Sequence, residues 1–129
     1  MSGDFSHAVV NSLLVVSLAA MLTGCQQGNA TGTDNLSGDA KQGADLVRNY
    51  GCGGCHTIPG IAGADGNVGP PLNRVGTRTY IAGFLHNSPD NMAFWIENPQ
   101  KVLPGSAMPQ MGISAAEARD IAAFLSTLK

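Results

Sequence analysis

The chain has 129 residues and a formal net charge of −2, so it is long enough for one small domain and carries no strong electrostatic signature. This balance excludes the basic surface that nucleic-acid binding requires. Aromatic residues make up only 5% of the chain and glycine occupies 17 positions, so the large side chains that usually fill a small core are scarce.

An apolar segment without charge runs from Leu13 to Leu22. It is shorter than the roughly 20 residues of a bilayer-spanning helix and is typical of the hydrophobic region of a signal peptide. The letters LTGC that follow resemble the lipobox of bacterial lipoproteins, which implies that residues 1–24 are a signal peptide and that Cys25 becomes lipid-modified. No Lys or Arg precedes the apolar segment, so a plain secretory peptide or a short buried helix stays open as an alternative.

The next segment, residues 25–37, is polar and rich in Gly, Asn and Thr. It cannot bury enough apolar surface to fold, which predicts a flexible tether. We therefore expect the folded domain to span residues 38–129.

Three helices are predicted in this domain from their capping residues. The first has Asp39 as N-cap and ends at Gly51, the second has Ser88 as N-cap and stops before Pro99, and the last begins at Ser114 with a capping box. Alternation with a period of two residues is missing throughout, so no strand is expected. The sequence predicts an all-α domain. Gly43 inside the first helix lowers helix stability by up to about 1 kcal/mol relative to Ala. Close approach of another element would explain a glycine at this position.

Directly after the first helix, Cys52, Cys55 and His56 form a Cys-x-x-Cys-His motif. A closed zinc site needs four ligands, and the domain adds only His86. A thioredoxin-like dithiol belongs in a strand-to-helix turn, whereas here a helix comes first. The spacing suits covalent attachment of a c-type haem, since two thiols can add to its vinyl groups while the next residue presents an imidazole to the iron. A redox dithiol remains the open alternative.

Together with this motif, the stretches VGPPL, FWIENP and PGSAMP are similar to the class I cytochromes c, and most of all to the cytochrome c domain of bacterial cytochrome c oxidase subunit II and to related lipoprotein cytochromes. The resemblance implies a fold in which the N- and C-terminal helices cross, at Gly43, while short middle helices and loops surround one covalently bound haem c. It also implies thioether bonds at Cys52 and Cys55, with His56 as the proximal iron ligand.

The same resemblance implies roles for residues along the rest of the domain. The Pro70 carbonyl would accept a hydrogen bond from His56, Leu72 would pack on the haem, and Met108 would be the distal ligand. Contacts to the haem propionates are implied for Arg78, Tyr80 and Trp95, with Arg74 as a further possibility.

Three residues of possible ligand type are expected to have other roles. His86 is interpreted as an exposed loop residue, because it belongs to no motif of the family. Met92 and Met111 are interpreted as packing residues, Met111 in a staple-like contact with the final helix.

A haem iron with His and Met ligands has both axial positions filled, which implies a single-electron carrier rather than an enzyme. We expect an exported monomer on the periplasmic or other extracytoplasmic face of a bacterial membrane, held by a lipid anchor, with no small-molecule substrate. Its partners would be redox proteins: a terminal oxidase, a quinol-oxidising complex or a dehydrogenase. A haem protein whose displaceable Met108 serves ligand sensing or peroxidase-like chemistry is the alternative.

Overall fold

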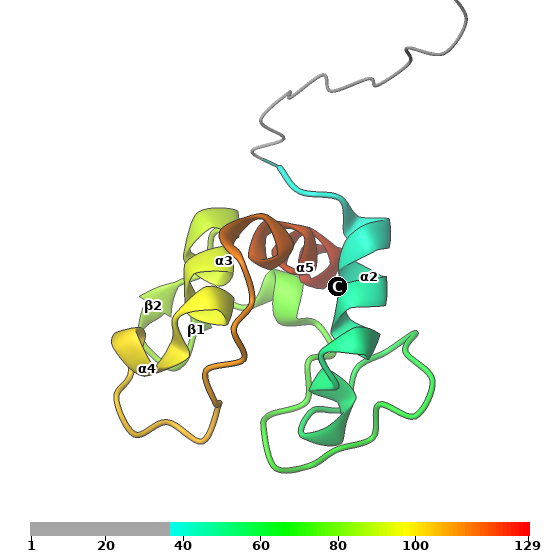
Figure 1. The fold of residues 1–129 in the computed structure, drawn as a ribbon, viewed down its shortest axis with the longest axis horizontal. Coiled ribbons are helices and arrows are strands. Elements are labelled where there is room, and N and C mark those ends of the chain that lie inside the picture. Colours follow the sequence, from blue (N-terminus) through cyan, green and yellow to red (C-terminus); the bar gives the residue numbers. More distant parts are fainter. Residues whose placement is uncertain (1–36) are drawn as a thin grey trace, which may run out of the picture. The chain divides into compact units, whose positions relative to one another are not determined.

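The computed structural model describes residues 37–129. The predicted signal peptide 1–24, Cys25 and the tether before residue 37 lie outside the described residues. The described part contains four α-helices, two short 3₁₀ helices and one hairpin of two-residue strands (Figure 1), in the order α2 (Ala40–Asn49), η2 (Cys52–Gly54), η3 (Val75–Thr77), β1 (Tyr80–Ile81), β2 (Leu85–His86), α3 (Pro89–Glu97), α4 (Pro99–Val102) and α5 (Ala115–Thr127). The regular structure of the described residues is mainly helical, which agrees with the expected all-α fold.

Each of the three predicted helices begins at the residue that its cap predicts. Asp39 accepts hydrogen bonds from the backbone at the start of α2, and Ser88 does so at the start of α3. At α5, Ser114 and Glu117 form the complete capping box. Because these hydrogen bonds satisfy N–H groups that a helix leaves unpaired in its first turn, the caps fix where each helix starts.

Helices α2 and α5 cross at Gly43, as predicted, and lie side by side in Figure 1. A Cβ atom at Gly43 would meet the backbone carbonyl of Asp120 in α5. The Asp120 side chain in turn accepts a hydrogen bond of 2.7 Å from the backbone N–H of Asp39. The absence of a side chain at Gly43 thus permits direct backbone contact between the two terminal helices.

A second contact joins the end of α2 to the start of α5. Burial, and then Glu117, raise the pKa of Tyr50. Hydrogen bonds from the Ser114 side chain and backbone, and then from Tyr50, lower the pKa of Glu117. The capping carboxylate of α5 therefore also bonds to Tyr50, two residues before Cys52.

Two features of the fold differ from the prediction. The strands β1 and β2 pair Tyr80 with His86 and Ile81 with Leu85, so His86 belongs to a strand rather than a loop, although it is exposed as expected. Its ring lies edge-on to Tyr80, with centroids 6.4 Å apart. Beyond the predicted stop at Pro99, the short helix α4 follows at once. Two-residue strands and a single helical turn are too short to show any periodicity in sequence.

The buried core of residues 37–129 contains only aliphatic side chains, alanine and one methionine. Met92 is buried, as predicted. Most of the larger core residues face a cavity on one side, namely Val47, Ile58, Val75, Ile81, Met92, Ile96, Ile113, Ile121 and Leu125. None of the described helices is long and apolar enough to cross a membrane.

Candidate functional site

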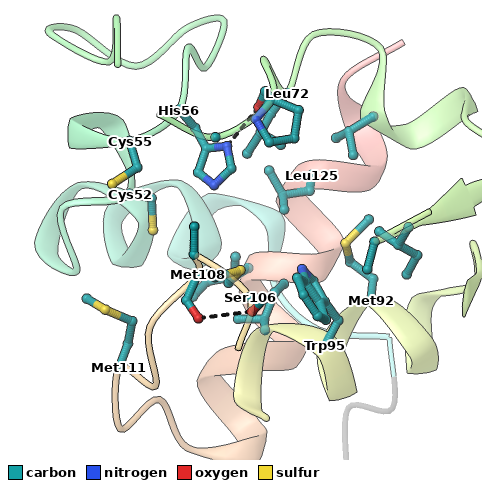
Figure 2. Close-up of a pocket in the computed structure, with 18 of the residues that line it drawn as sticks. Cys52, Cys55, His56, Leu72, Met92, Trp95, Ser106, Met108, Met111 and Leu125 are labelled. Carbon is teal, nitrogen blue, oxygen red and sulfur yellow. Dashed lines mark hydrogen bonds between the residues drawn. The ribbon is translucent and has the colours of Figure 1, made fainter. Parts of the chain in front are cut away.

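A cavity of about 640 Å³ lies within the fold and is lined by segments from nearly the whole domain. Its volume falls in the range of about 300–1,000 Å³ that is typical of sites for small molecules and cofactors. Figure 2 shows Cys52, Cys55 and His56 on one side of this pocket and Met108 on the other. The residues of the predicted haem motif and the predicted distal methionine therefore meet at one cavity.

The segment with the two cysteines takes its shape from a left-handed residue and a 3₁₀ turn. Gly51 has a φ of 68°, which glycine adopts at no steric cost, and η2 then carries Cys52, Gly53 and Gly54. The next backbone N–H groups, of Cys55 and His56, both donate to the Cys52 carbonyl. This turn brings both thiols and the imidazole to the same cavity.

Neither cysteine of the described chain forms a disulfide. Burial raises the pKa of the Cys52 thiol, a hydrogen bond from the backbone opposes the change, and the nearby Cys55 adds to it. Nucleophilic cysteines of dithiol oxidoreductases have a lowered pKa, so the environment of Cys52 differs from theirs. Among residues 37–129, no group of three His, Cys, Asp or Glu side chains could hold a metal ion such as zinc.

The His56 ring has a defined orientation. Its Nδ1 atom lies 2.7 Å from the Pro70 carbonyl oxygen. Because a carbonyl can only accept, Nδ1 carries the hydrogen and donates, and in the neutral ring this tautomer leaves the Nε2 lone pair for a metal. A hydrogen bond of this kind fixes the tautomer and the ring orientation of a metal-binding histidine. The predicted contact between Pro70 and His56 is present.

Gly69 fixes the ring from a second side, and sequence reasoning missed it. A Cβ atom at this position would lie 2.7 Å from Nδ1 and 2.8 Å from Nε2 of His56. Real Cβ atoms do not approach other atoms so closely, so the ring can occupy its place only because residue 69 is glycine. The sequence shows a glycine directly before Pro70. It does not show that this glycine contacts His56, because the two residues are 13 positions apart.

We expect Gly69→Ala to displace the His56 ring, because the φ of Gly69 suits alanine and the steric clash is then the main effect. Overpacking of this kind costs about 1–3 kcal/mol. The measurement is the absorption spectrum of the purified protein. The high-spin fraction of the expected haem iron should rise, because its expected proximal ligand His56 is displaced. Asn67→Ala, at an exposed neighbour, is the control. A Gly69→Ala spectrum identical to that of the control would contradict the steric role.

The predicted distal residue Met108 lies at the cavity on an irregular segment before Pro109. It is half-buried, and its carbonyl oxygen accepts a hydrogen bond of 2.6 Å from the Gln100 side chain. Met111 also lines the cavity, but its side chain is 39% exposed. The expected packing of Met111 at the start of α5 is therefore wrong: Ile113, which directly precedes the N-cap of α5, is the buried residue there.

Of the residues predicted to contact the propionates, the structure places three at the cavity and one away from it. Arg78, Tyr80 and Trp95 line the cavity. The Arg78 guanidinium donates to the carbonyls of Pro71 and Asn73, and Tyr80 is 55% exposed. Arg74 is exposed and is not among the described residues that line the cavity.

Leu72 and Trp95 complete the predicted set. Both line the cavity and pack against the core. Within the part of the chain that the structure describes, the Trp95 indole N–H has no hydrogen-bond acceptor. A donor of this type at the wall of an apolar cavity is available to a bound group.

These features fit a covalently bound haem. The cavity walls are largely apolar, which suits the flat macrocycle, and two thiols with an adjacent imidazole provide the attachment chemistry. Arg78, Tyr80 and Trp95 line the cavity and carry cationic and hydrogen-bonding groups of the kind that bind carboxylates. Among residues 37–129, no aromatic side chain is buried, and this cofactor would provide the missing apolar surface.

Comparison with known proteins identifies the family of the chain. The family model for cytochrome c matches residues 40–129. Cytochrome c oxidase subunit 2 of Alkalihalophilus pseudofirmus is 34% identical over 91 residues, which are 70% of this chain and 26% of that protein. Cytochrome c of Arabidopsis thaliana is 33% identical over 104 residues, which cover 70% of this chain and 90% of the plant protein.

The chain thus spans about a quarter of the oxidase subunit but nearly all of the plant cytochrome. The family match extends over α2, α5 and every described residue that lines the cavity. The chain therefore belongs to the class I cytochromes c, a family of electron-carrying proteins with covalently bound haem c.

Proposed function

We propose that this protein is an exported, membrane-tethered cytochrome c that carries single electrons between redox protein partners and has no enzymatic activity. The observation that supports this most is that His56 and Met108 face one apolar cavity beside two free cysteines. Each residue type at that cavity has a defined task in holding a c-type haem.

In this proposal, Cys52 and Cys55 would form the thioether bonds, and Nε2 of His56 and the Met108 sulfur would be the iron ligands. The bound haem supplies an iron that alternates between the ferrous and ferric states. The Pro70 carbonyl keeps His56 in the tautomer that binds metal and raises its basicity. With His56 and Met108 both bound to the iron, no position would be left for a substrate or for oxygen.

The chain also controls the surroundings of the iron. Leu72 and the aliphatic core residues exclude water from the cavity walls, and exclusion of water is one way in which proteins set a haem potential. Arg78, Tyr80 and Trp95 are proposed to bind the propionates. Support for this comes from their position at the cavity and from the unpaired indole N–H of Trp95 among the described residues.

The absorption spectrum tests the proposal, using the full chain made in a bacterial host that attaches c-type haem. We expect a coloured protein with covalently bound, low-spin haem that does not bind carbon monoxide readily when reduced. A colourless, folded product with two free thiols would overturn it in favour of a dithiol oxidoreductase. Ready binding of carbon monoxide would indicate a sensor or a peroxidase-like protein.

Redox partners are proposed to dock at the surface around the cavity mouth. Residues 37–129 carry few lysines, at positions 41, 101 and 129, so long-range electrostatic steering should be weak and the reaction rate should depend only mildly on salt. The relatives named cytochrome c oxidase subunit 2 support a terminal oxidase as one candidate partner, beside a quinol-oxidising complex and a dehydrogenase.

The membrane anchor is proposed to be a lipid on Cys25, at the start of the polar segment that leads to the folded domain. It would keep the cytochrome close to partners in the same membrane.

We expect Cys25→Ser to release the protein into the soluble exported fraction with an unchanged haem spectrum, because the residue is remote in sequence from the haem motif. The measurement is fractionation of cells followed by detection of covalent haem. If the variant stays in the membrane, the uncleaved apolar segment Leu13–Leu22 would be the anchor instead.

A further inference from the structure

Beyond the ligands themselves, one polar side chain holds the segment that carries Met108. Gln100 is the second residue of α4 and is half-buried. Its Nε2 atom lies 2.6 Å from the Met108 carbonyl oxygen, 2.9 Å from the Ser106 carbonyl oxygen and 3.1 Å from the Ser106 hydroxyl. Its Oε1 atom lies 3.0 Å from the backbone nitrogen of Gly105. One amide group thus contacts three residues of the segment 105–108.

The partners fix which way the amide faces. The Gly105 N–H can only donate and the Met108 carbonyl can only accept, so Oε1 and Nε2 cannot be exchanged. The two hydrogens of the amide serve the two carbonyls, while the Ser106 hydroxyl shares one of them or donates to Met108, at 3.4 Å. All of the hydrogen-bonding capacity of Gln100 toward this segment is therefore used in one arrangement.

The segment has little else to hold it. The last backbone hydrogen bond before α5 joins the Ser106 N–H to the Leu103 carbonyl at 3.1 Å. Within the described chain, no backbone–backbone hydrogen bond involves residues 107–113. A second amide, that of Gln110, donates to the Glu97 carbonyl at the end of α3. Side-chain amides therefore order this segment in place of the backbone hydrogen bonds of a helix or sheet. Backbone groups without such partners bond to water and are more mobile.

We infer that Gln100 is the positioning residue for Met108: it fixes the backbone from Gly105 to Met108 so that the thioether is held toward the cavity before and during iron binding. The inference rests on the proposed role of Met108 as distal ligand. Without Gln100, binding of the thioether would have to order a free loop, and the conformational entropy of that ordering opposes the bond.

Two amide-to-acid substitutions test this as a matched pair. Gln100→Glu keeps an acceptor for the Gly105 N–H and removes the donors to the Ser106 and Met108 carbonyls. Asn87→Asp removes a similar pair of bonds elsewhere in the fold, since Asn87 Nδ2 donates to the carbonyls of Val75 and Arg78 at 2.9 and 2.8 Å. Both variants add one negative charge and remove the amide donor from two carbonyls.

The readout is the ferric sulfur-to-iron charge-transfer absorption, followed with temperature alongside the far-ultraviolet circular dichroism of the same samples. For Gln100→Glu we expect the absorption to disappear well below the unfolding temperature, with about a tenfold increase in the equilibrium constant for its loss. Hydrogen exchange of the Ser106 amide, which donates to the Leu103 carbonyl, should also quicken. For Asn87→Asp, absorption and helicity should disappear together.

Loss of the absorption only in step with unfolding in Gln100→Glu, as in the control, would overturn the inference and leave the role of Met108 intact. A wild-type protein without this absorption would refute the Met108 ligand, and the inference with it. If Gln100→Glu fails to fold, Gln100→Ala gives the same comparison without a carboxylate facing carbonyl oxygens.

Discussion

The Met108→Ala variant is expected to lose the ferric sulfur-to-iron charge-transfer absorption almost completely, to bind carbon monoxide in the reduced state and to have a lower reduction potential. The thioether favours ferrous iron and fills an axial position, and both effects disappear with it. Met111→Ala is the matched control, since it removes the same side chain three residues further on. It should keep the absorption and lose at most about 1 kcal/mol of stability, as is usual at partly exposed positions.

The structure distinguishes the two methionines by how their backbones are held. Met108 precedes Pro109, which favours an extended conformation, and its carbonyl is bound by Gln100 at 2.6 Å. Met111 is 39% exposed and is followed by Gly112 with a φ of 71°. An ordered segment loses less entropy when its side chain binds a metal, so Met108 is the better ligand. Loss of the absorption only in Met111→Ala would reverse the assignment.

The helices could be predicted because their start signals are local. Asp39, Ser88 and Ser114 each bind backbone N–H groups two or three residues further along the chain, and such contacts depend on sequence spacing alone. The hairpin with His86 and the helix α4 were missed. Each is too short for periodicity, and the hairpin depends on the left-handed residues Ala82 and Gly83 at its turn, of which alanine gives no sequence signal.

The candidate site shows the same division. Cys52, Cys55, His56 and Pro70 could be predicted because a motif or a resemblance marks them, and the hydrogen bond from His56 to Pro70 is present in the structure. Gly69 and Gln100 could not, because their roles lie in what they touch: an imidazole ring 13 positions away and three groups of an irregular segment.

The crossing of α2 and α5 leads to a prediction about the stability of the whole domain. Gly43→Ala should lower the free energy of unfolding by about 1–3 kcal/mol, the cost of overpacking at a well-packed site. The new Cβ would meet the backbone carbonyl of Asp120, and a backbone atom cannot move aside without separating the helices. Guanidinium denaturation of the ferric protein, followed by circular dichroism, measures the change.

The sign of this effect is what makes the experiment decisive, because intrinsic helix propensity acts in the opposite direction. In an unpacked helix, alanine in place of glycine stabilises by about 1 kcal/mol, and Gly43 has a φ that alanine adopts easily. Gln42→Ala, at the exposed neighbouring position, provides the control for a new alanine in α2 and should change stability by less than about 0.5 kcal/mol. A Gly43→Ala protein as stable as the wild type would mean that α2 and α5 do not meet at this residue. A loss that the control does not share would instead show that direct backbone contact between the terminal helices holds the walls of the cavity together.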